Sequence, residues 1–171
     1  MVTIIEKVNP IILGICEANI GPLASLSAIQ LEGYSLEIDS RHSRGGTARA
    51  AVYVSTNASY IRRQDLEPED SPCVWLEMTG ARHKPWLLFL GYREWESPTK
   101  GSLYGSRSIK DQCERLSIWG RSWERALLEG KPLYIMGDIN IDTQNPRCGT
   151  LGIPILNETS FRPFTGSYSD K

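Results

Sequence analysis

The sequence contains few of the residues that build zinc sites or disulfide frameworks. Its 171 residues include four cysteines and two histidines. The cysteines, Cys16, Cys73, Cys113 and Cys148, form neither a Cys-x-x-Cys pair nor a Cys/His cluster, which argues against a structural zinc site. Scattered thiols are typical of a reducing compartment rather than of a disulfide-stabilised secreted domain.

The sequence also lacks an excess of charge of either sign and any long apolar run. The formal net charge is −1, with 19 Lys and Arg against 20 Asp and Glu. A non-specific polyanion binder is usually more basic, so any contact with nucleic acid would depend on local arginines. No run reaches transmembrane length, and the first residues lack the pattern of a secretory signal. We therefore expect an intracellular protein, cytoplasmic or nuclear, that is not secreted and has no membrane association. The sequence does not indicate an oligomeric state.

Apolar periodicity predicts a layered α/β domain, with mostly antiparallel sheets flanked by helices. The length and the hydrophobic fraction of 40% are sufficient for a substantial core. The expected strands are residues 11–16, 33–39, 47–55, 59–64, 73–79, 86–92 and 133–136; the first and the last are continuous apolar runs and are expected to be buried. The expected helices are the last turns of a helix within residues 1–9, then residues 23–30 and 108–130. Trp119 and Trp123 lie on the apolar stripe of the last helix and should belong to the core. We expect one domain at residues 1–142 and an irregular tail at residues 143–171.

Three of the expected strands end in polar side chains. The first ends at Glu17, the strand at residues 86–92 ends at Tyr92 and Arg93, and the last is followed by Asp138 and Asn140. Asp138 and Asn140 lie two residues apart, so on an extended backbone they project to the same side. A carboxylate and a carboxamide placed in this way can hold a water, a metal ion or a phosphate oxygen. The same residue types also favour turns, and the interpretation of a strand that simply ends stays open.

The order of these segments resembles the endonuclease/exonuclease/phosphatase superfamily, and within it the apurinic-endonuclease-like domain of non-LTR retrotransposon polyproteins. The segments that carry the resemblance are ILGICEANI, RGGTARAAVYV, CVWLEMTGARHKPWLLFLGYREW, ERLSIWGRSWERALLEGKP and LYIMGDINID. They stand where that family has an apolar strand ending in a metal-binding glutamate, a Gly/Arg segment leading into a strand, and a strand ending in Tyr-Arg. The resemblance covers residues 9–142 and implies a layered α/β sandwich of that type.

The resemblance implies hydrolysis of phosphodiester bonds in DNA, assisted by Mg²⁺ or Mn²⁺. Glu17 would be the metal ligand, since a hard cation takes oxygen ligands and often only one or two carboxylates. Asp138 would orient the attacking water, and Asn140 would bind a phosphate oxygen. Tyr92 would stabilise the phosphate or the leaving group, and Arg93 would pair with a neighbouring phosphate. DNA is then the expected substrate, and the reverse transcriptase domain of a parent polyprotein is the expected partner.

Other basic residues are less informative. Arg44 and Arg49 lie in the Gly/Arg segment and would hold DNA phosphates, although hairpin turns carry exposed arginines without any such function. The sequence places His42 and His83 in loops, where we expect surface residues.

The chain also departs from the family that it resembles. The family opens with a strand that carries a catalytic asparagine and closes with a Ser-Asp-His motif, whereas this chain ends in Ser169-Asp170-Lys171. A lysine cannot replace the imidazole, and catalytic groups act as a unit. We therefore expect a domain truncated at both ends, with weak or lost nuclease activity. The alternatives are a catalytically inactive retroelement remnant or nucleic-acid-binding domain, and a phosphatase of the same superfamily.

Overall fold

The computed structural model describes residues 7–69, 71–80, 83–93 and 117–138 of the chain. The chain divides into two units, Met1–Asn140 and Ile141–Lys171, and all described residues belong to the first. The described strands are β1 (Ile12–Ile20), β2 (Tyr34–Ile38), β3 (Ala48–Ser55), β4 (Ser59–Arg62), β5 (Cys73–Gly80), β6 (His83–Tyr92) and β7 (Leu133–Asp138). Three short 3₁₀ helices, η1 (Leu26–Ile29), η2 (His42–Arg44) and η3 (Gln64–Leu66), lie between strands, and residues 117–127 form an α-helix.

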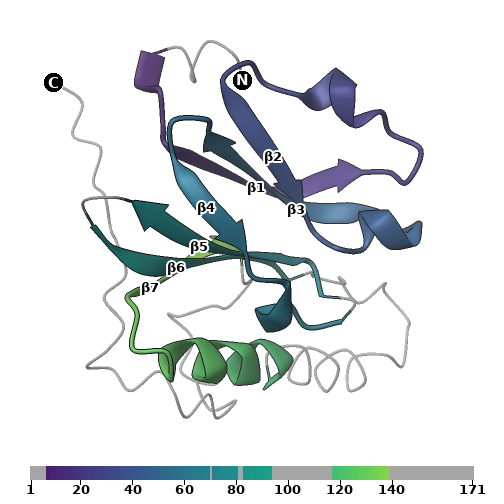
Figure 1. The fold of residues 1–171 in the computed structure, drawn as a ribbon. Helices are drawn as coiled ribbons and strands as arrows, with labels where there is room; N and C mark the ends of the chain where they lie inside the picture. Colours follow the sequence, from purple (N-terminus) through teal and green to yellow (C-terminus); the bar gives the residue numbers. More distant parts are fainter. Residues whose placement is uncertain (1–6, 70, 81–82, 94–116, 139–171) are drawn as a thin grey trace, which may run out of the picture. The chain divides into compact units, whose positions relative to one another are not determined.

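The strands form two sheets, so the expected mixed α/β class is confirmed (Figure 1). The first sheet has the order β1-β3-β2 and is antiparallel throughout. The second has the order β4-β5-β6-β7, and its pairs are antiparallel except for the parallel pair of β6 and β7. A parallel pair needs a crossover connection, and in this chain residues 93–132 connect β6 to β7. No helix among the described residues is long and apolar enough to cross a membrane.

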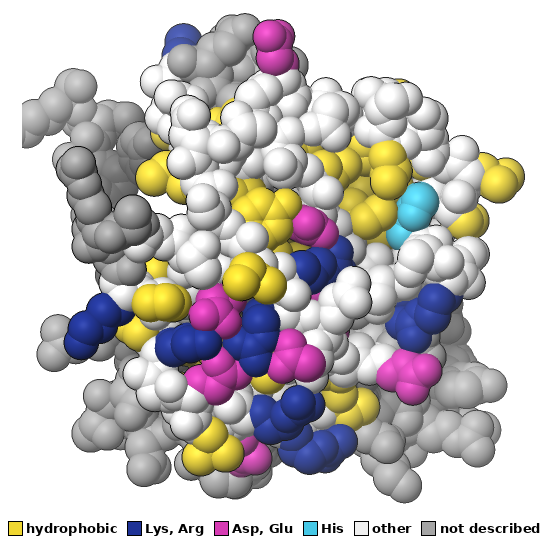
Figure 2. Space-filling view, in the orientation of Figure 1, with side chains coloured by type: hydrophobic (Ala, Val, Ile, Leu, Met, Phe, Trp, Pro, Cys, Tyr) yellow, Lys and Arg dark blue, Asp and Glu magenta, His cyan; other side chains and the backbone are white. Residues whose placement is uncertain are grey.

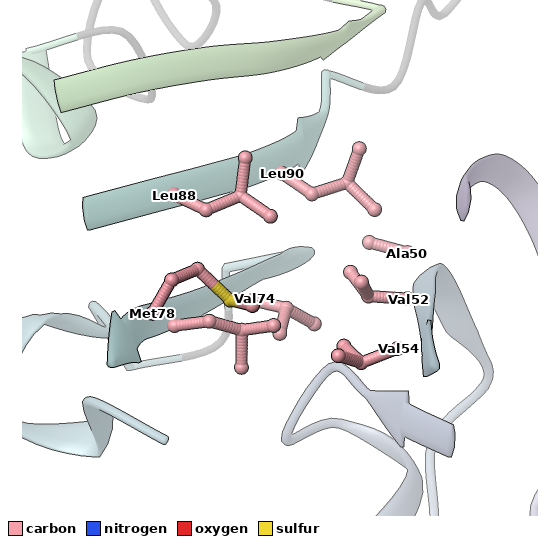
Figure 3. Close-up of a cluster of buried hydrophobic side chains, with 8 residues drawn as sticks. Ala50, Val52, Val54, Val74, Met78, Leu88 and Leu90 are labelled. Atoms are coloured by element: carbon pink, nitrogen blue, oxygen red, sulfur yellow. The ribbon is translucent and has the colours of Figure 1, made fainter. Parts of the chain in front are cut away.

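The main core lies between the two sheets. Successive side chains of a strand point to opposite faces, and every second residue of β3 therefore faces the second sheet. These residues of β3 pack against side chains of β5 and β6, all at most 5% exposed (Figure 3). The members of the cluster are Ala50, Val52, Val54, Val74, Leu76, Met78, Leu88 and Leu90. Alanine and valine on the side of β3, and mostly leucine and methionine on the side of β5 and β6, fill this space without polar side chains.

The α-helix covers the other face of the second sheet. Trp119 and Trp123 are 2% and 3% exposed, as expected for the apolar stripe of this helix. Both contact Phe89 of β6 edge-on, with ring centroids 5.2 and 5.4 Å apart. The prediction of this helix is confirmed for residues 117–127; its expected first part, residues 108–116, lies outside the described residues.

An ion-pair network holds the segment that leads from this helix to β7. Glu129 accepts hydrogen bonds from Arg63 and Lys131, and both of these cations also contact Glu77 of β5. A second network joins the two sheets, because Glu37 of β2 accepts a hydrogen bond from Arg62 of β4 at 2.7 Å. Figure 2 shows basic and acidic side chains lying next to one another on one face of the molecule.

Two predictions about the first part of the chain are wrong. The helix expected at residues 23–30 is only the single turn η1, and Leu23 on its expected apolar stripe is 98% exposed. Of that stripe only Ile29 packs against the apolar cluster of the first sheet, so no face of a longer helix would be buried. The first strand extends to Ile20 and is partly rather than fully buried, because β1 is an outer strand of its described sheet.

The last strand is also less buried than its sequence indicates. Tyr134, Ile135 and Met136 of β7 are 57%, 37% and 39% exposed. Among the described strands, β7 pairs only with β6 and forms the edge of the sheet. The apolar run predicted a strand correctly and its burial wrongly, because sequence pattern does not specify which strand is outermost.

The two histidines also differ from expectation. His83 is the first residue of β6 rather than part of a loop. His42 lies in η2, where its Nε2 atom is buried and has no hydrogen-bond partner among the residues that the structure describes.

Candidate functional site

Glu17, which lies within β1, is beside the ends of β6 and β7, so three of the predicted site residues come together. The Tyr92 hydroxyl donates a hydrogen bond to Glu17 Oε1 at 2.6 Å, which joins the two sheets. Tyr92 is paired with Asp138 in the parallel register of β6 and β7. The backbone N–H of Arg93 continues this pairing and donates to the Asp138 carbonyl at 2.9 Å. Glu17 and Tyr92, 75 positions apart in the chain, and Tyr92 and Asp138, 46 positions apart, therefore lie next to one another in the paired sheets.

Cys16 links the same three strands through its thiol. Its Sγ accepts a hydrogen bond from the Asp138 N–H at 3.3 Å and donates to the Gly91 carbonyl at 3.6 Å. Burial raises the pKa of the Cys16 thiol, and the nearby charges of Asp138 and Glu17 raise it further. The thiol therefore stays protonated and can donate to Gly91 at neutral pH. Sequence reasoning did not single out this residue, which closes the apolar run directly before Glu17.

Tyr92 is held as a hydrogen-bond donor. The hydrogen bond to Glu17 is the largest of the effects that raise the pKa of Tyr92 to about 12; burial and the charge of Glu17 add to it, and the charge of Arg49 opposes it. The phenol is therefore neutral throughout the physiological pH range. It can stabilise an anion by donating its proton in a hydrogen bond, and it cannot serve as a general base there.

Glu17 has a strained backbone. Its φ of 54° lies in the left-handed region, which a residue with a long side chain rarely adopts. The strain follows from an irregularity in the pairing of β1 with β3, which shifts register between Cys16 and Ile20. Such backbone strain is found preferentially at binding and catalytic sites, where a side chain has to be aimed in one direction. The carboxylate is exposed to solvent and points to Tyr92.

The predicted arginines separate into different environments. Arg93 is only 5% exposed, so it is a buried arginine and not a surface one. Arg49 contacts the side-chain oxygen of Asn19 and lies close enough to Tyr92 to influence its pKa. Arg44 in η2 donates to Ser40 Oγ at 3.1 Å and lies 3.7 Å from Glu69. Of the predicted phosphate-binding arginines, Arg49 is therefore the one that lies beside Glu17 and Tyr92. It is partly exposed.

The sequence did not indicate a role for two further polar residues of this region, Asn19 and Asp39. Asn19 was not considered because an isolated asparagine two residues after a glutamate carries no motif. Asp39 closes a predicted strand and is 1% exposed, and its carboxylate accepts hydrogen bonds from the backbone N–H groups of Arg41, Arg49 and Ala50. Asn140, the fourth predicted residue of the cluster, lies outside the described residues.

The described residues offer oxygen ligands but no closed metal cage. Among them, no group of three or more His, Cys, Asp and Glu side chains is placed to hold a metal ion. Glu17 and Asp138 provide two exposed carboxylates near one another in the fold. Mg²⁺ and Mn²⁺ accept this kind of donor set, because they keep several waters and use one or two carboxylates. Zn²⁺ in a structural site would require four ligands.

Comparisons of the chain with models of protein families, with curated proteins and with solved structures found no match. The resemblance to the endonuclease/exonuclease/phosphatase superfamily therefore rests on the sequence segments alone.

Proposed function

We propose that this chain carries a divalent-metal-assisted site for the hydrolysis of phosphodiester bonds in DNA, on a sandwich of the endonuclease/exonuclease/phosphatase type. One observation carries the proposal: the Tyr92 hydroxyl of β6 donates a hydrogen bond to Glu17 of β1, and Tyr92 is paired with Asp138 of β7. The three residues that the sequence suggested as metal ligand, phosphate-binding group and water-orienting residue therefore lie together. The resemblance to retrotransposon endonuclease domains supplies the substrate and would place a reverse transcriptase in the same parent polyprotein.

The side chains have distinct tasks in this proposal. Glu17 would hold Mg²⁺ or Mn²⁺, which when bound would supply positive charge next to the scissile phosphate. The Tyr92 hydroxyl, which has a single proton to donate, would then donate its hydrogen bond to a phosphate oxygen instead of to Glu17. The Asp138 carboxylate would orient the attacking water.

A second candidate function is nucleic-acid binding without cleavage. It is favoured by the hydrogen bond that the Glu17 carboxylate already accepts from the Tyr92 hydroxyl. The Glu17 carboxylate would have to give up this hydrogen bond from Tyr92 before the same oxygen could bind a metal ion.

A plasmid-nicking assay separates the two candidates. The wild-type chain is incubated with supercoiled DNA in Mg²⁺, in Mn²⁺ and in EDTA, beside the variants Asp138→Ala and Glu17→Gln. Glu124→Gln is the matched control, because it removes one exposed carboxylate from the helix at residues 117–127. We expect metal-dependent nicking by the wild type and by Glu124→Gln, with loss of at least tenfold in the two site variants. Nicking that is equal in wild type and both site variants would refute the enzymatic proposal.

A further inference from the structure

The bulge of β1 places three residues opposite one residue of β3. Cys16 is paired with Ala50, and the next pair is Ile20 with Ala48. Residues 17–19 of β1 therefore lie opposite Arg49 alone. Glu17 and Asn19 both have left-handed φ angles, 54° and 51°. Asparagine tolerates this conformation better than most residues, so Asn19 fits a bulge that turns its side chain toward the neighbouring strand.

Arg49 is held at both ends by this arrangement. Its backbone N–H donates to the buried carboxylate of Asp39 at 2.6 Å. Its guanidinium donates to the side-chain oxygen of Asn19. A guanidinium that is oriented before binding loses less conformational entropy when it contacts a phosphate, and its planar donors match phosphate oxygens.

The held arginine lies beside the proposed catalytic cluster. Asn19 is two residues from Glu17, and Glu17 accepts the hydrogen bond of Tyr92. Arg49 lies opposite residues 17–19 in the pairing of β1 with β3, so it is next to Glu17 in the sheet. A phosphodiester strand that reached Tyr92 would therefore pass near Arg49.

We propose that Asn19 and Arg49 form a phosphate-binding pair, in which Arg49 contacts a backbone phosphate of DNA and Asn19 is the positioning residue that orients its guanidinium. The ligand class, a DNA phosphodiester, rests on the function proposed above. The phosphate bound by the pair is next to the one held by Tyr92, so the pair sets the register of the strand without taking part in the bond cleavage.

The test measures DNA binding in EDTA, where no metal-assisted cleavage takes place. The affinity for a short DNA duplex is measured at several salt concentrations for the wild type, Arg49→Gln, Asn19→Ala and Asn19→Gly. Arg121→Gln is the control, because Arg121 is an exposed arginine of the helix and its replacement changes the net charge by the same amount as Arg49→Gln. Urea unfolding of each variant establishes that it is folded.

Arg49→Gln should weaken binding roughly tenfold and lower the slope of log affinity against log salt by about 0.9, the value for one phosphate contact. Asn19→Gly should also lower the slope although it removes no charge, because Arg49 is no longer oriented. Asn19→Gly keeps a backbone that accepts the left-handed φ, so it remains informative if Asn19→Ala does not fold. Arg121→Gln should leave the slope unchanged.

Three results would overturn the proposal: no DNA binding, equal effects of Arg49→Gln and Arg121→Gln, or wild-type slopes in both Asn19 variants. Failure of the proposed hydrolysis is a separate result. A wild-type chain that binds with an Arg49-dependent slope but does not nick plasmid supports the phosphate-binding pair and refutes the enzymatic function. A chain that nicks plasmid with wild-type KM in Asn19→Gly supports the enzymatic function and refutes the pair.

Discussion

Replacement of Glu17 by glutamine tests the central contact of the site. The variant keeps the size of the side chain and an acceptor oxygen, and removes the negative charge that faces the Tyr92 hydroxyl at 2.6 Å. The hydrogen bond to Glu17 is the largest cause of the high pKa of Tyr92, which is raised from 10.0 to about 12. In Glu17→Gln the pKa of Tyr92 should therefore fall toward its ordinary value, and burial should keep it from reaching that value.

The same shift determines how stability depends on pH. Because the pKa of Tyr92 is higher in the folded state, its contribution to stability is fully present below pH 10 and is lost as the pH rises through about 12. A shift of this size corresponds to about 2.7 kcal/mol. The Glu17 carboxylate is exposed, so screening by water should reduce the contribution to about 1 kcal/mol. In Glu17→Gln this contribution should become smaller and should be lost at a lower pH.

The assay combines an alkaline titration with a double-mutant cycle. Phenolate absorbance is followed for wild type and Glu17→Gln, and the titration of the matching Tyr92→Phe variant is subtracted to isolate Tyr92 from the other tyrosines. Urea unfolding of the wild type, the two single variants and the double variant gives the coupling free energy, which we expect to be about 1 kcal/mol. If Tyr92 titrates near 12 in Glu17→Gln, or if the coupling is zero, Glu17 does not set the state of this phenol.

Three further predictions concern the framework around the site. Gly137→Ala should destabilise the domain by several kcal/mol in urea unfolding, because an added Cβ would lie 1.9 Å from the Gly91 carbonyl oxygen and the φ of 128° disfavours any side chain. Asp39→Asn should cost about 3 kcal/mol, since its amide nitrogen would face backbone N–H groups that now donate to a buried carboxylate. Hydrogen bonds from Arg63 and Lys131 lower the pKa of Glu129 to about 2. The contribution of Glu129 to the free energy of unfolding is therefore present above pH 4.5 and is lost as the pH falls toward 2. Glu129→Gln should remove about 0.5 kcal/mol at neutral pH and flatten this part of the plot of stability against pH.

Each of these predictions has a result that would contradict it. Gly80→Ala is the control for Gly137, since nothing lies within 4 Å of its added Cβ, and equal effects of the two changes would argue against the steric cause. Wild-type stability of Asp39→Asn would show that the three N–H groups do not depend on the carboxylate. Stability differences for Glu129→Gln that do not shrink at high salt would contradict an ionic origin.

The sequence predicted where the strands lie far better than it predicted which of their residues are buried. The alternating apolar residues of β3 predicted this strand and the buried face that carries Ala50, Val52 and Val54. The opposite face, with Ala51 and Tyr53, is buried as well, which the alternation did not indicate. A continuous apolar run such as that of β7 carries no such information, and its burial was predicted wrongly. Residues 23–30 have helical spacing, but three apolar residues cannot stabilise a helix that lacks a surface to pack against. The burial of Arg93 could not be predicted either, because the sequence shows the charge of a residue and not its neighbours.

The candidate site was predictable only in part, for a related reason. Glu17, Tyr92 and Asp138 each follow an apolar strand, which a sequence shows directly. The contacts that orient them come from residues with no sequence signature: Cys16 joins the strand ends through its thiol, and Asn19 holds Arg49 across a bulge. A bulge is set by the pairing of two strands and cannot be read from one of them.

Gly137, which precedes Asp138, connects the sequence pattern of β7 with the geometry of the site. In sequence, Gly137 is simply a residue at which an apolar strand stops. In the structure it lies opposite Gly91 of β6, and an added Cβ would lie 1.9 Å from the Gly91 carbonyl oxygen. This close approach brings the Asp138 N–H within 3.3 Å of Cys16 Sγ and the Asp138 carbonyl to the Arg93 N–H. The Gly-Asp pair therefore belongs to the site as a unit: the glycine sets the distance between the strands, and this distance places the carboxylate of the next residue beside Tyr92. A variant that introduces a side chain at Gly137 should displace Asp138 from Tyr92 even if the domain still folds.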